Sequence, residues 1–293
     1  MIRALALLLI GMMPFMSHAQ SKPMAILTPE DSIVVSRESV RSDEAYDVIQ
    51  SNIHFVNALF AEHLRPEEVS HDALLSYYVD YYLAQVNNGG FSQFVYNSRW
   101  RPGVIDRVRE GLKVMGAKQN LALFEEGASG VSALGQAKLK TFFGSEYFGE
   151  NPARDGLNSI DDRFFALQKK EDLIRLNSAW LKGHPKLVVL SEADLKKEVA
   201  RRAAAVPDRA ARAKEALAAE PRYMKLIRAL CAKAGQELDD VTAGDPSHQY
   251  GGQTVLAWHF ITNKGHHFMV EADGKAMMFD GTSGAKIAEI KAP

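Results

Sequence analysis

The sequence predicts a mainly α-helical protein that ends in a small α+β module. Apolar and aromatic residues recur at helical spacing around residues 74–85, whereas the last sixty residues consist of β-branched and aromatic runs separated by turn residues. Hydrophobic residues make up 46% of the 293 positions, which is enough to build proper cores. We therefore expect an all-helical domain at residues 30–185, Ala/Arg/Lys-rich connecting helices at 186–221, and an α+β module with an antiparallel meander at 222–293.

The N-terminal residues have the pattern of a secretory signal peptide, which we place at residues 1–19. Arg3 supplies a positive charge, residues 4–15 form a mostly apolar run, and Ser17-His18-Ala19 is a small-x-small cleavage site. We expect cleavage after Ala19 and a periplasmic or secreted protein. One alternative is an uncleaved anchor, although the run is far shorter than the roughly 20 residues that span a bilayer. The other is a buried first helix of a cytosolic protein.

A helix is expected to begin after Ser70 and to stop at a glycine break. Ser70 is a good N-cap residue, and the negative charge of Asp72 suits the first turn of a helix. The apolar and aromatic residues that follow line one stripe at i, i+3 and i+4 spacing: Leu74, Leu75, Tyr77, Tyr78, Tyr81 and Tyr82. Gly89-Gly90 then permits a sharp reversal, because glycine adopts a positive φ without the cost of roughly 1–2 kcal/mol that other residues meet. A second, short helix is expected from Phe91.

The residues around this break are the candidate site of the chain, with a structural or a binding role. They are Asn87, Asn88, Gly89, Gly90, Phe91, Gln93 and Asn97. Gln93 and Asn97 are the candidates to hydrogen-bond the carbonyl and amide groups that a helix break exposes. An alternative is that Asp43, Glu44, Asp80 and Gln93 line a cleft near the motif, which would leave room for an enzyme with an unrecognised site.

The helix and its Asn-Gly-Gly-Phe break resemble the family of DNA-mimic proteins and their relatives, in which Gln and Asn follow at the same spacing. Residues 104–117 look like the family's next helix, and residues 161–173, which run on to Trp180 and Leu181, are similar to its closing acidic and aromatic helices. The resemblance covers residues 40–185. It implies a compact all-helical fold and, for the best-known member, an acidic surface that competes with DNA for a DNA-binding protein.

The charge of the chain differs from that of a DNA mimic, which should present a dense negative field. The whole chain carries 35 basic and 36 acidic residues. Residues 30–185 hold 22 Asp and Glu against 17 Lys and Arg, a net charge of −5, and residues 186–293 hold 14 against 16, a net charge of +2. We therefore expect no nucleic acid as a partner, and DNA mimicry is the alternative for a chain that is not exported.

Residues 196–233 form a basic stretch, with 11 basic and 4 acidic residues and a net charge of +7. One interpretation is a cationic face for peripheral contact with anionic lipid head groups or for an acidic partner. The other, which we favour, is an ordinary solvated helical face that complements the acidic first domain. Few bulky apolar residues precede Tyr223, so we do not expect a helix that inserts into a membrane.

The end of the chain predicts a helix at 222–234 packed on a three- or four-stranded meander. The runs 253–262 and 266–271 are rich in β-branched and aromatic residues, and Asn-Lys-Gly at 263–265 and Asp-Gly at 273–274 supply turns. The last strands also vaguely resemble the small exported modules known as PepSY domains.

The sequence contains no recognisable catalytic constellation. It has no His-Glu-x-x-His, Gly-x-Ser-x-Gly, Cys-x-x-Cys or Gly-x-x-x-x-Gly-Lys motif. His259, His266 and His267 are weak metal candidates, with His259 facing His267 across a hairpin, but no spacing rule places a third ligand. The other interpretation is polar residues on the open face of a sheet. The single cysteine, Cys231, rules out an intramolecular disulfide and is expected to be an inert, packed thiol.

These observations together predict an exported protein that binds an unknown protein partner in the cell envelope without catalysis. We expect neither a cofactor nor a metal. An enzyme should present the polar side chains of the glycine motif to solvent in a concave site, whereas a structural motif should bury them.

Overall fold

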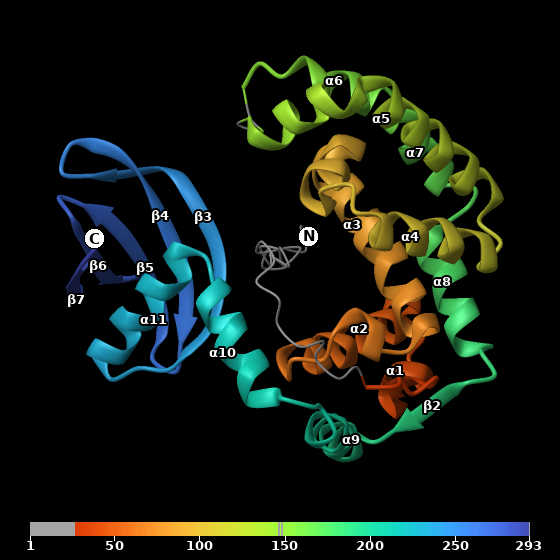
Figure 1. Cartoon of the computed structure of the whole chain (residues 1–293), viewed down its shortest axis with the longest axis horizontal. Helices are drawn as coiled ribbons and strands as arrows, with labels where there is room; N and C mark the ends of the chain where they lie inside the picture. Colours follow the sequence, from red (N-terminus) through yellow and green to blue (C-terminus); the bar gives the residue numbers. More distant parts are fainter. Residues whose placement is uncertain (1–26, 146, 148, 293) are drawn as a thin grey trace. The chain divides into compact units, whose positions relative to one another are not determined.

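The predicted fold class is confirmed by the structure, a computed structural model that describes residues 27–145, 147 and 149–292. Helices dominate, and a five-stranded antiparallel sheet follows towards the C-terminus (Figure 1). The chain divides into two compact units, one that ends at Arg209 and one that begins at Ala210. The predicted signal peptide lies outside the described residues. Among the helices of the described part, none is long and apolar enough to cross a membrane.

The first unit is built mainly of α-helices and short 3-10 helices. In chain order these are α1 (Arg37–Arg41), α2 (Ala45–Ala61), η1 (Pro66–Glu68), α3 (His71–Ser98), α4 (Pro102–Val114), α5 (Lys118–Gly144), α6 (Pro152–Leu157), η2 (Asn158–Ile160), α7 (Asp161–Gln168), α8 (Leu173–Lys182) and α9 (Glu192–Ala204). Local sequence signals set several of these boundaries. The Ser70 hydroxyl accepts a hydrogen bond from the Ala73 amide at 3.3 Å and caps α3 as predicted. Pro102 opens α4, where its missing amide hydrogen costs nothing.

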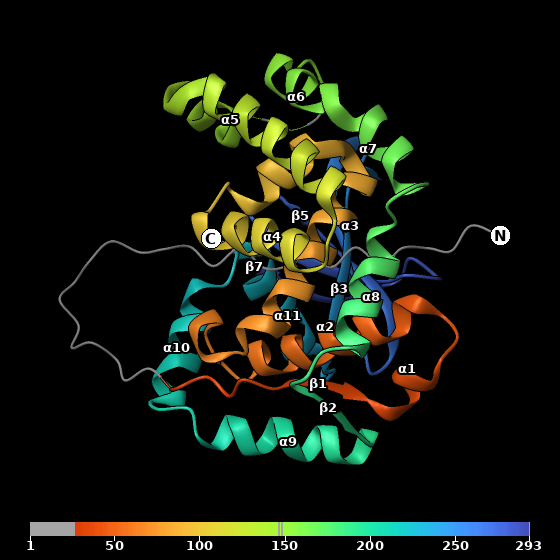
Figure 2. The same cartoon turned by 90° about the vertical axis from the view of Figure 1, so that its right-hand side faces the viewer.

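Two short strands that the sequence analysis did not anticipate also belong to this unit. β1 (Ile33–Ser36) and β2 (Leu187–Leu190) pair in parallel, with Ile33 opposite Leu187. They lie side by side in Figure 2, and α9 contacts both strands. Every residue of β1 is buried. The apolar side chains of β1 therefore fix this pairing through the core, without a local turn signal.

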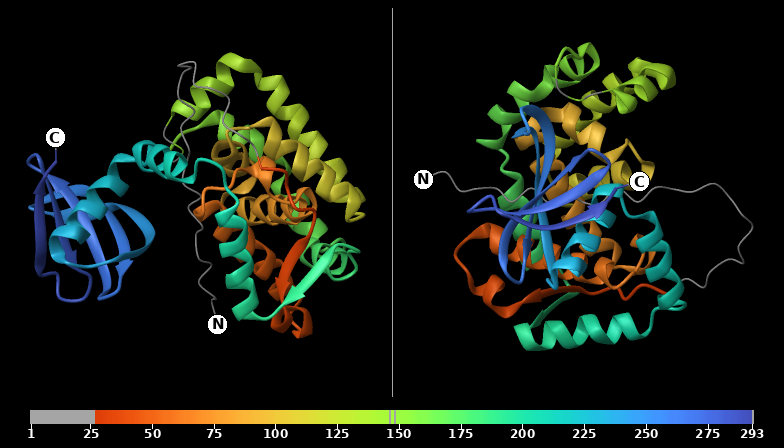
Figure 3. Two further views of the ribbon diagram at one scale, coloured as in Figure 1. Left: turned by 60° about the horizontal axis from the view of Figure 1, so that its bottom comes forward. Right: turned by 90° about the vertical axis from the view of Figure 1, so that its left-hand side faces the viewer.

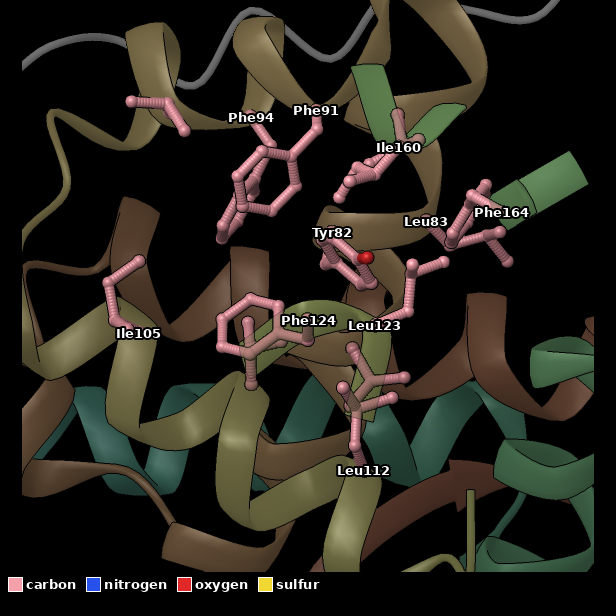
Figure 4. Close-up of a cluster of buried hydrophobic side chains, with 14 of the residues drawn as sticks. Tyr82, Leu83, Phe91, Phe94, Ile105, Leu112, Leu123, Phe124, Ile160 and Phe164 are labelled. Carbon is pink, nitrogen blue, oxygen red and sulfur yellow. The ribbon is translucent and has the colours of Figure 1, made fainter. Parts of the chain in front are cut away.

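Aromatic side chains form the core around α3, α5 and α7. Tyr82, Phe91, Phe94, Phe124 and Phe164 are fully buried (Figure 4). The ring centroids of the four phenylalanines lie 5.1–6.4 Å from that of Tyr82, all in edge-to-face arrangements. Each such pair contributes roughly 0.5–1.5 kcal/mol beyond the area it buries. The aromatic stripe predicted from the sequence therefore packs inward at Tyr82.

A second core joins α2 to the helices on either side of it. Ile53 of α2 packs in one cluster with Leu74 and Tyr77 of α3 and with Leu181 of α8. The buried Asn52 side chain donates a hydrogen bond to the Ala73 carbonyl at 2.9 Å and so fixes the position of α2 against α3. Helix α2 is therefore an integral part of the core of the first unit.

The basic stretch begins in α9, where arginines pair with nearby carboxylates. The first unit ends with α9 and the start of α10 (Arg209–Ala219). Arg201 lies 2.6 Å from Glu30, and the buried Arg202 lies 2.8 Å from Glu198. Several of the positive charges counted in the sequence are therefore neutralised within the unit that carries them.

The second unit is a helix packed on an antiparallel sheet (Figure 3). It contains α11 (Arg222–Ala234), β3 (Leu238–Tyr250), β4 (Gln253–Thr262), β5 (Gly265–Ala272), β6 (Lys275–Asp280) and β7 (Lys286–Lys291). The strands pair in chain order. The helix has the predicted bounds, whereas the meander has five strands and not three or four, because residues 238–250 also form a strand. The PepSY resemblance stays a prediction.

Candidate functional site

The glycine break divides α3 into two helical segments. Gly89 has φ −158° and ψ 25°, and Gly90 has φ 81° and ψ 178°. The conformation of Gly90 belongs to a region that is essentially restricted to glycine. The positive φ predicted for this break is therefore confirmed at Gly90 alone, and the predicted stop is a kink after which the helix resumes.

Side chains from the end of the helical domain cap the second segment of α3. Asp161 Oδ1 accepts a hydrogen bond from the Phe91 amide at 2.9 Å, and Asn158 Oδ1 accepts one from the Ser92 amide at 2.8 Å. These amides would otherwise be unpaired, because the kink removes their partners in the preceding turn. The caps come from 70 and 66 residues along the chain. No signal close to the motif in sequence indicated them.

Tyr147 holds the carbonyl side of the break. Its hydroxyl donates to the Gly89 carbonyl at 2.7 Å and lies 2.7 Å from the Ser92 hydroxyl. Burial of the ring raises the pKa of Tyr147, so this hydroxyl keeps its proton at neutral pH and serves as a donor.

The capping side chains also leave no room for a residue larger than glycine at position 90. A Cβ atom at this position would lie 2.6 Å from Asn158 Oδ1 and closer still to Asp161 Oδ2. Burial raises the pKa of Asp161, and the hydrogen bond from the Phe91 amide opposes that shift. Backbone conformation and lack of space therefore both require glycine here, and this part of the motif has a structural role.

The two amide side chains predicted to bind the break form hydrogen bonds elsewhere. Gln93 Nε2 donates to Gln85 Oε1 at 3.1 Å, and Asn97 Nδ2 donates to the same oxygen at 2.6 Å. The prediction is wrong because both side chains use Gln85 Oε1 as their acceptor, and Asp161, Asn158 and Tyr147 pair the backbone groups of the break instead. Asn87 and Asn88 are exposed. The polar part of the motif is therefore an uncharged amide surface.

Asp80, which the sequence placed near a cleft, is hydrogen-bonded to Tyr46 at the start of α2. Burial raises the pKa of Asp80 to about 7, and the hydrogen bond from Tyr46 works against this shift. The carboxyl group is therefore partly protonated at neutral pH. The cleft described next includes neither Asp80 nor Gln93.

A cleft of about 540 Å³ opens between α1, α2 and α9. It is lined by Ser36, Glu38, Ser39, Asp47, Gln50, Ser51, His54, Phe55, Ala58, Glu192, Leu195, Lys196 and Val199. Its volume is within the range of roughly 300–1,000 Å³ found for ligand sites in proteins. Sequence reasoning missed this cleft because its two walls, residues 36–58 and 192–199, are distant in the chain.

The serine hydroxyls of the cleft bind backbone groups. Ser36 Oγ accepts from the Ser39 amide at 3.0 Å, and Ser39 Oγ donates to the Ser36 carbonyl at 2.8 Å. Ser51 Oγ accepts from the Ser36 amide at 2.7 Å. His54 forms no hydrogen bond to these hydroxyls in the described part of the chain. A nucleophile next to an oriented base, which covalent catalysis needs, is therefore not assembled by these residues.

The three histidines considered as metal candidates lie on two faces of the sheet. His259 Nδ1 lies 3.0 Å from His266 Nε2. His267 is buried on the other face, with its Nε2 3.0 Å from Thr262 Oγ1. The register pairs His259 with Phe268, so the expected approach of His259 to His267 is wrong, because neighbouring residues of a strand point to opposite faces. Within the described ranges, no three His, Cys, Asp or Glu side chains gather into a metal-binding group.

The first unit is therefore a helical domain with a glycine break in α3, and side chains from later in the chain pair the backbone groups of that break. Residues 67–184, which include this break and its caps, match the model of the family described as DMP19-like protein. The match spans less than half of the chain. No curated protein and no solved structure matches the chain.

This match corrects the resemblance predicted from the sequence. The expected extent, residues 40–185, is wrong, because the match begins at residue 67 and leaves out α2. The Asn-Gly-Gly-Phe motif at residues 88–91 lies within the matched range. The cleft between α1, α2 and α9 is built entirely from residues outside the matched range. The description of the family therefore carries no information about the cleft.

Proposed function

We propose that this chain is exported and acts in the cell envelope by binding a protein partner without catalysis. The cleft between α1, α2 and α9 is the observation that carries this proposal. It combines an apolar floor with a polar rim, which is the usual composition of a surface that recognises another molecule. Export is supported by the charged, apolar and small-residue pattern of residues 1–19.

The absence of an activated nucleophile among the lining residues supports binding over catalysis. The three serines of the cleft wall use their hydroxyl groups in the turn before α1 and in holding that turn against α2. Such contacts fix the shape of the wall, which benefits a preformed binding surface.

Fractionation of the native cell, followed by intact-mass analysis of the recovered protein, tests the export half of the proposal. We expect a periplasmic product that begins at Gln20. A cytoplasmic product that retains Met1 would contradict the proposal and would redirect the search to cytoplasmic partners.

A second candidate function is DNA mimicry, which the family match favours. Two observations weigh against it. Residues 67–184 hold 15 Asp and Glu against 14 Lys and Arg, a net charge of −1, and exposed carboxylates such as Glu126 are paired with arginine, here Arg163. A mimic of the DNA backbone needs a concentrated negative field. Competition between this protein and duplex DNA for nucleoid-binding proteins, abolished by added salt, would support this second function.

A further inference from the structure

We propose that the cleft between α1, α2 and α9 binds an amphipathic, basic helical segment of the partner protein. This inference rests on the proposed function and specifies the chemistry of the partner. It follows from the arrangement of apolar side chains at the floor of the cleft and of unpaired carboxylates at its rim.

The floor of the cleft is formed by apolar pairs on two helices. Phe55 and Ala58 lie three residues apart on α2, and Leu195 and Val199 lie four residues apart on α9, so each pair occupies one face of its helix. Phe55 is only 5% exposed, and the other three side chains are half-buried. Apolar pairs on two neighbouring helices can accept the i, i+3 and i+4 side chains of a third helix.

Three carboxylates lie at the rim of the cleft. Glu38, Asp47 and Glu192 form neither an ion pair nor a side-chain hydrogen bond within the described residues, although carboxylates elsewhere in the unit, such as Glu198, are paired. Lys196 is the lysine of the lining, so the rim has three carboxylates against one ammonium group. Charge complementarity therefore favours a segment that carries Lys or Arg.

Each of these three carboxylates also lies in the first turn of its helix, where a negative charge is favourable. Helix stability explains each residue separately. It does not explain why three helix starts meet around one apolar floor.

The length of the cleft sets the length of the segment. The lining residues of α2 run from Asp47 to Ala58, which corresponds to about 16 Å along a helix axis at a rise of about 1.5 Å per residue. A segment of about three helical turns would fill that length. Its apolar stripe would face Phe55 and Leu195, and its basic residues would reach the rim.

Binding of synthetic peptides to the full chain tests this inference. The probe is a fluorescent 14-residue peptide of Leu and Lys at helical spacing, and its matched control has Glu in place of every Lys. We expect the Leu/Lys peptide to bind with an affinity at least tenfold higher than the Leu/Glu peptide in a fluorescence anisotropy titration. Equal binding of both peptides would overturn the inference.

Variants at the rim locate the binding to the cleft. The double variant Glu38→Gln with Glu192→Gln should weaken binding of the Leu/Lys peptide at least tenfold. The matched control is Asp162→Asn, which removes an exposed carboxylate from the first turn of α7, away from the cleft, and should leave binding unchanged. Equal losses in both variants would show non-specific charge attraction and would overturn the inference.

A variant that binds the peptide more tightly than wild type gives a result that loss of folding cannot produce. Lys196→Glu removes the lysine from the rim at an exposed position and should strengthen binding of the Leu/Lys peptide at least threefold. A misfolded variant would not bind more tightly. Unchanged or weaker binding by a variant whose thermal melt matches the wild type would count against the rim as the recognition surface.

A photo-crosslinking residue in place of Ala58 separates this inference from the proposed function. Crosslinking in the periplasm to a basic helical segment would support both. Crosslinking there to a segment without Lys or Arg would overturn the inference and leave the proposed function in place, and crosslinking to a second copy of this chain would overturn the choice of occupant. A chain that stays in the cytoplasm would contradict the proposed function, while the peptide titrations would still decide the inference.

Discussion

Replacing Gly90 by alanine should destabilise the first unit by roughly 2–7 kcal/mol. A backbone at φ 81° and ψ 178° costs an L-residue about 1–3 kcal/mol. The new methyl group would also displace the Asp161 and Asn158 side chains, and loss of each cap costs about 0.5–2 kcal/mol. The upper part of the range applies if both capping hydrogen bonds are lost.

Gly135 in α5 offers a matched control for the backbone part of this cost. It has φ 72° and ψ 162°, almost the same conformation, and a Cβ atom there would meet nothing within 4 Å. Gly135→Ala should therefore cost at most about 3 kcal/mol, the backbone contribution alone. The difference between the two variants measures the contribution of the caps on α3.

Urea denaturation monitored by tryptophan fluorescence would measure both variants in a background with Trp180→Phe and Trp258→Phe. Trp100 then reports on the core beneath the break, since its ring centroid lies 6.0 Å from that of Phe91. Equal destabilisation by Gly90→Ala and Gly135→Ala would refute the capping role of Asp161 and Asn158.

Further predictions concern other side chains. Burial raises the pKa of Asp80 from 3.8 to about 7 on folding, so the wild-type protein should lose stability as the pH rises between these values. Asp80→Asn removes this dependence. In urea titrations the stability of the variant relative to wild type should therefore increase by up to about 3 kcal/mol between pH 5 and pH 8. Glu171→Ala should cost about 1–3 kcal/mol in the same assay, because its carboxylate accepts hydrogen bonds from the Gln119 and Asn120 amides at the start of α5 at 3.1 and 2.7 Å. As a control, Glu126→Ala should have no measurable effect, because the exposed Glu126 pairs with Arg163 at the surface. A loss equal to that of Glu171→Ala would contradict this account. Burial raises the pKa of Cys231, which should react with a thiol reagent only after unfolding, and fast labelling of the native protein would show an open site.

Features that depend on neighbouring residues could be predicted from the sequence. The cap at Ser70, the positive φ at Gly90 and the bounds of α11 all follow from signals within a few positions of the feature itself. Hydrophobic periodicity likewise predicted that the Tyr82 ring would pack against other apolar groups.

Features that depend on distant residues could not be predicted from one sequence. The pairing of Ile33 with Leu187 and the capping of Phe91 by Asp161 join segments that no local pattern connects. The orientation of His267 depended on the register of β4 with β5, and a shift of one residue turns every side chain to the other face. The cleft escaped prediction for the same reason, because neither wall forms it alone.

The position of α2 has a practical consequence for work on the family-matched range. Residues 67–184 contain Leu74, Tyr77 and Leu181, which α2 covers from outside that range. A fragment cut to the matched residues would present this apolar surface to water and would tend to aggregate. A soluble fragment should start before Ile33 and extend beyond Leu190, so that both strands and α2 are retained. The range that matches the family model is therefore shorter than the range that we expect to fold as one unit.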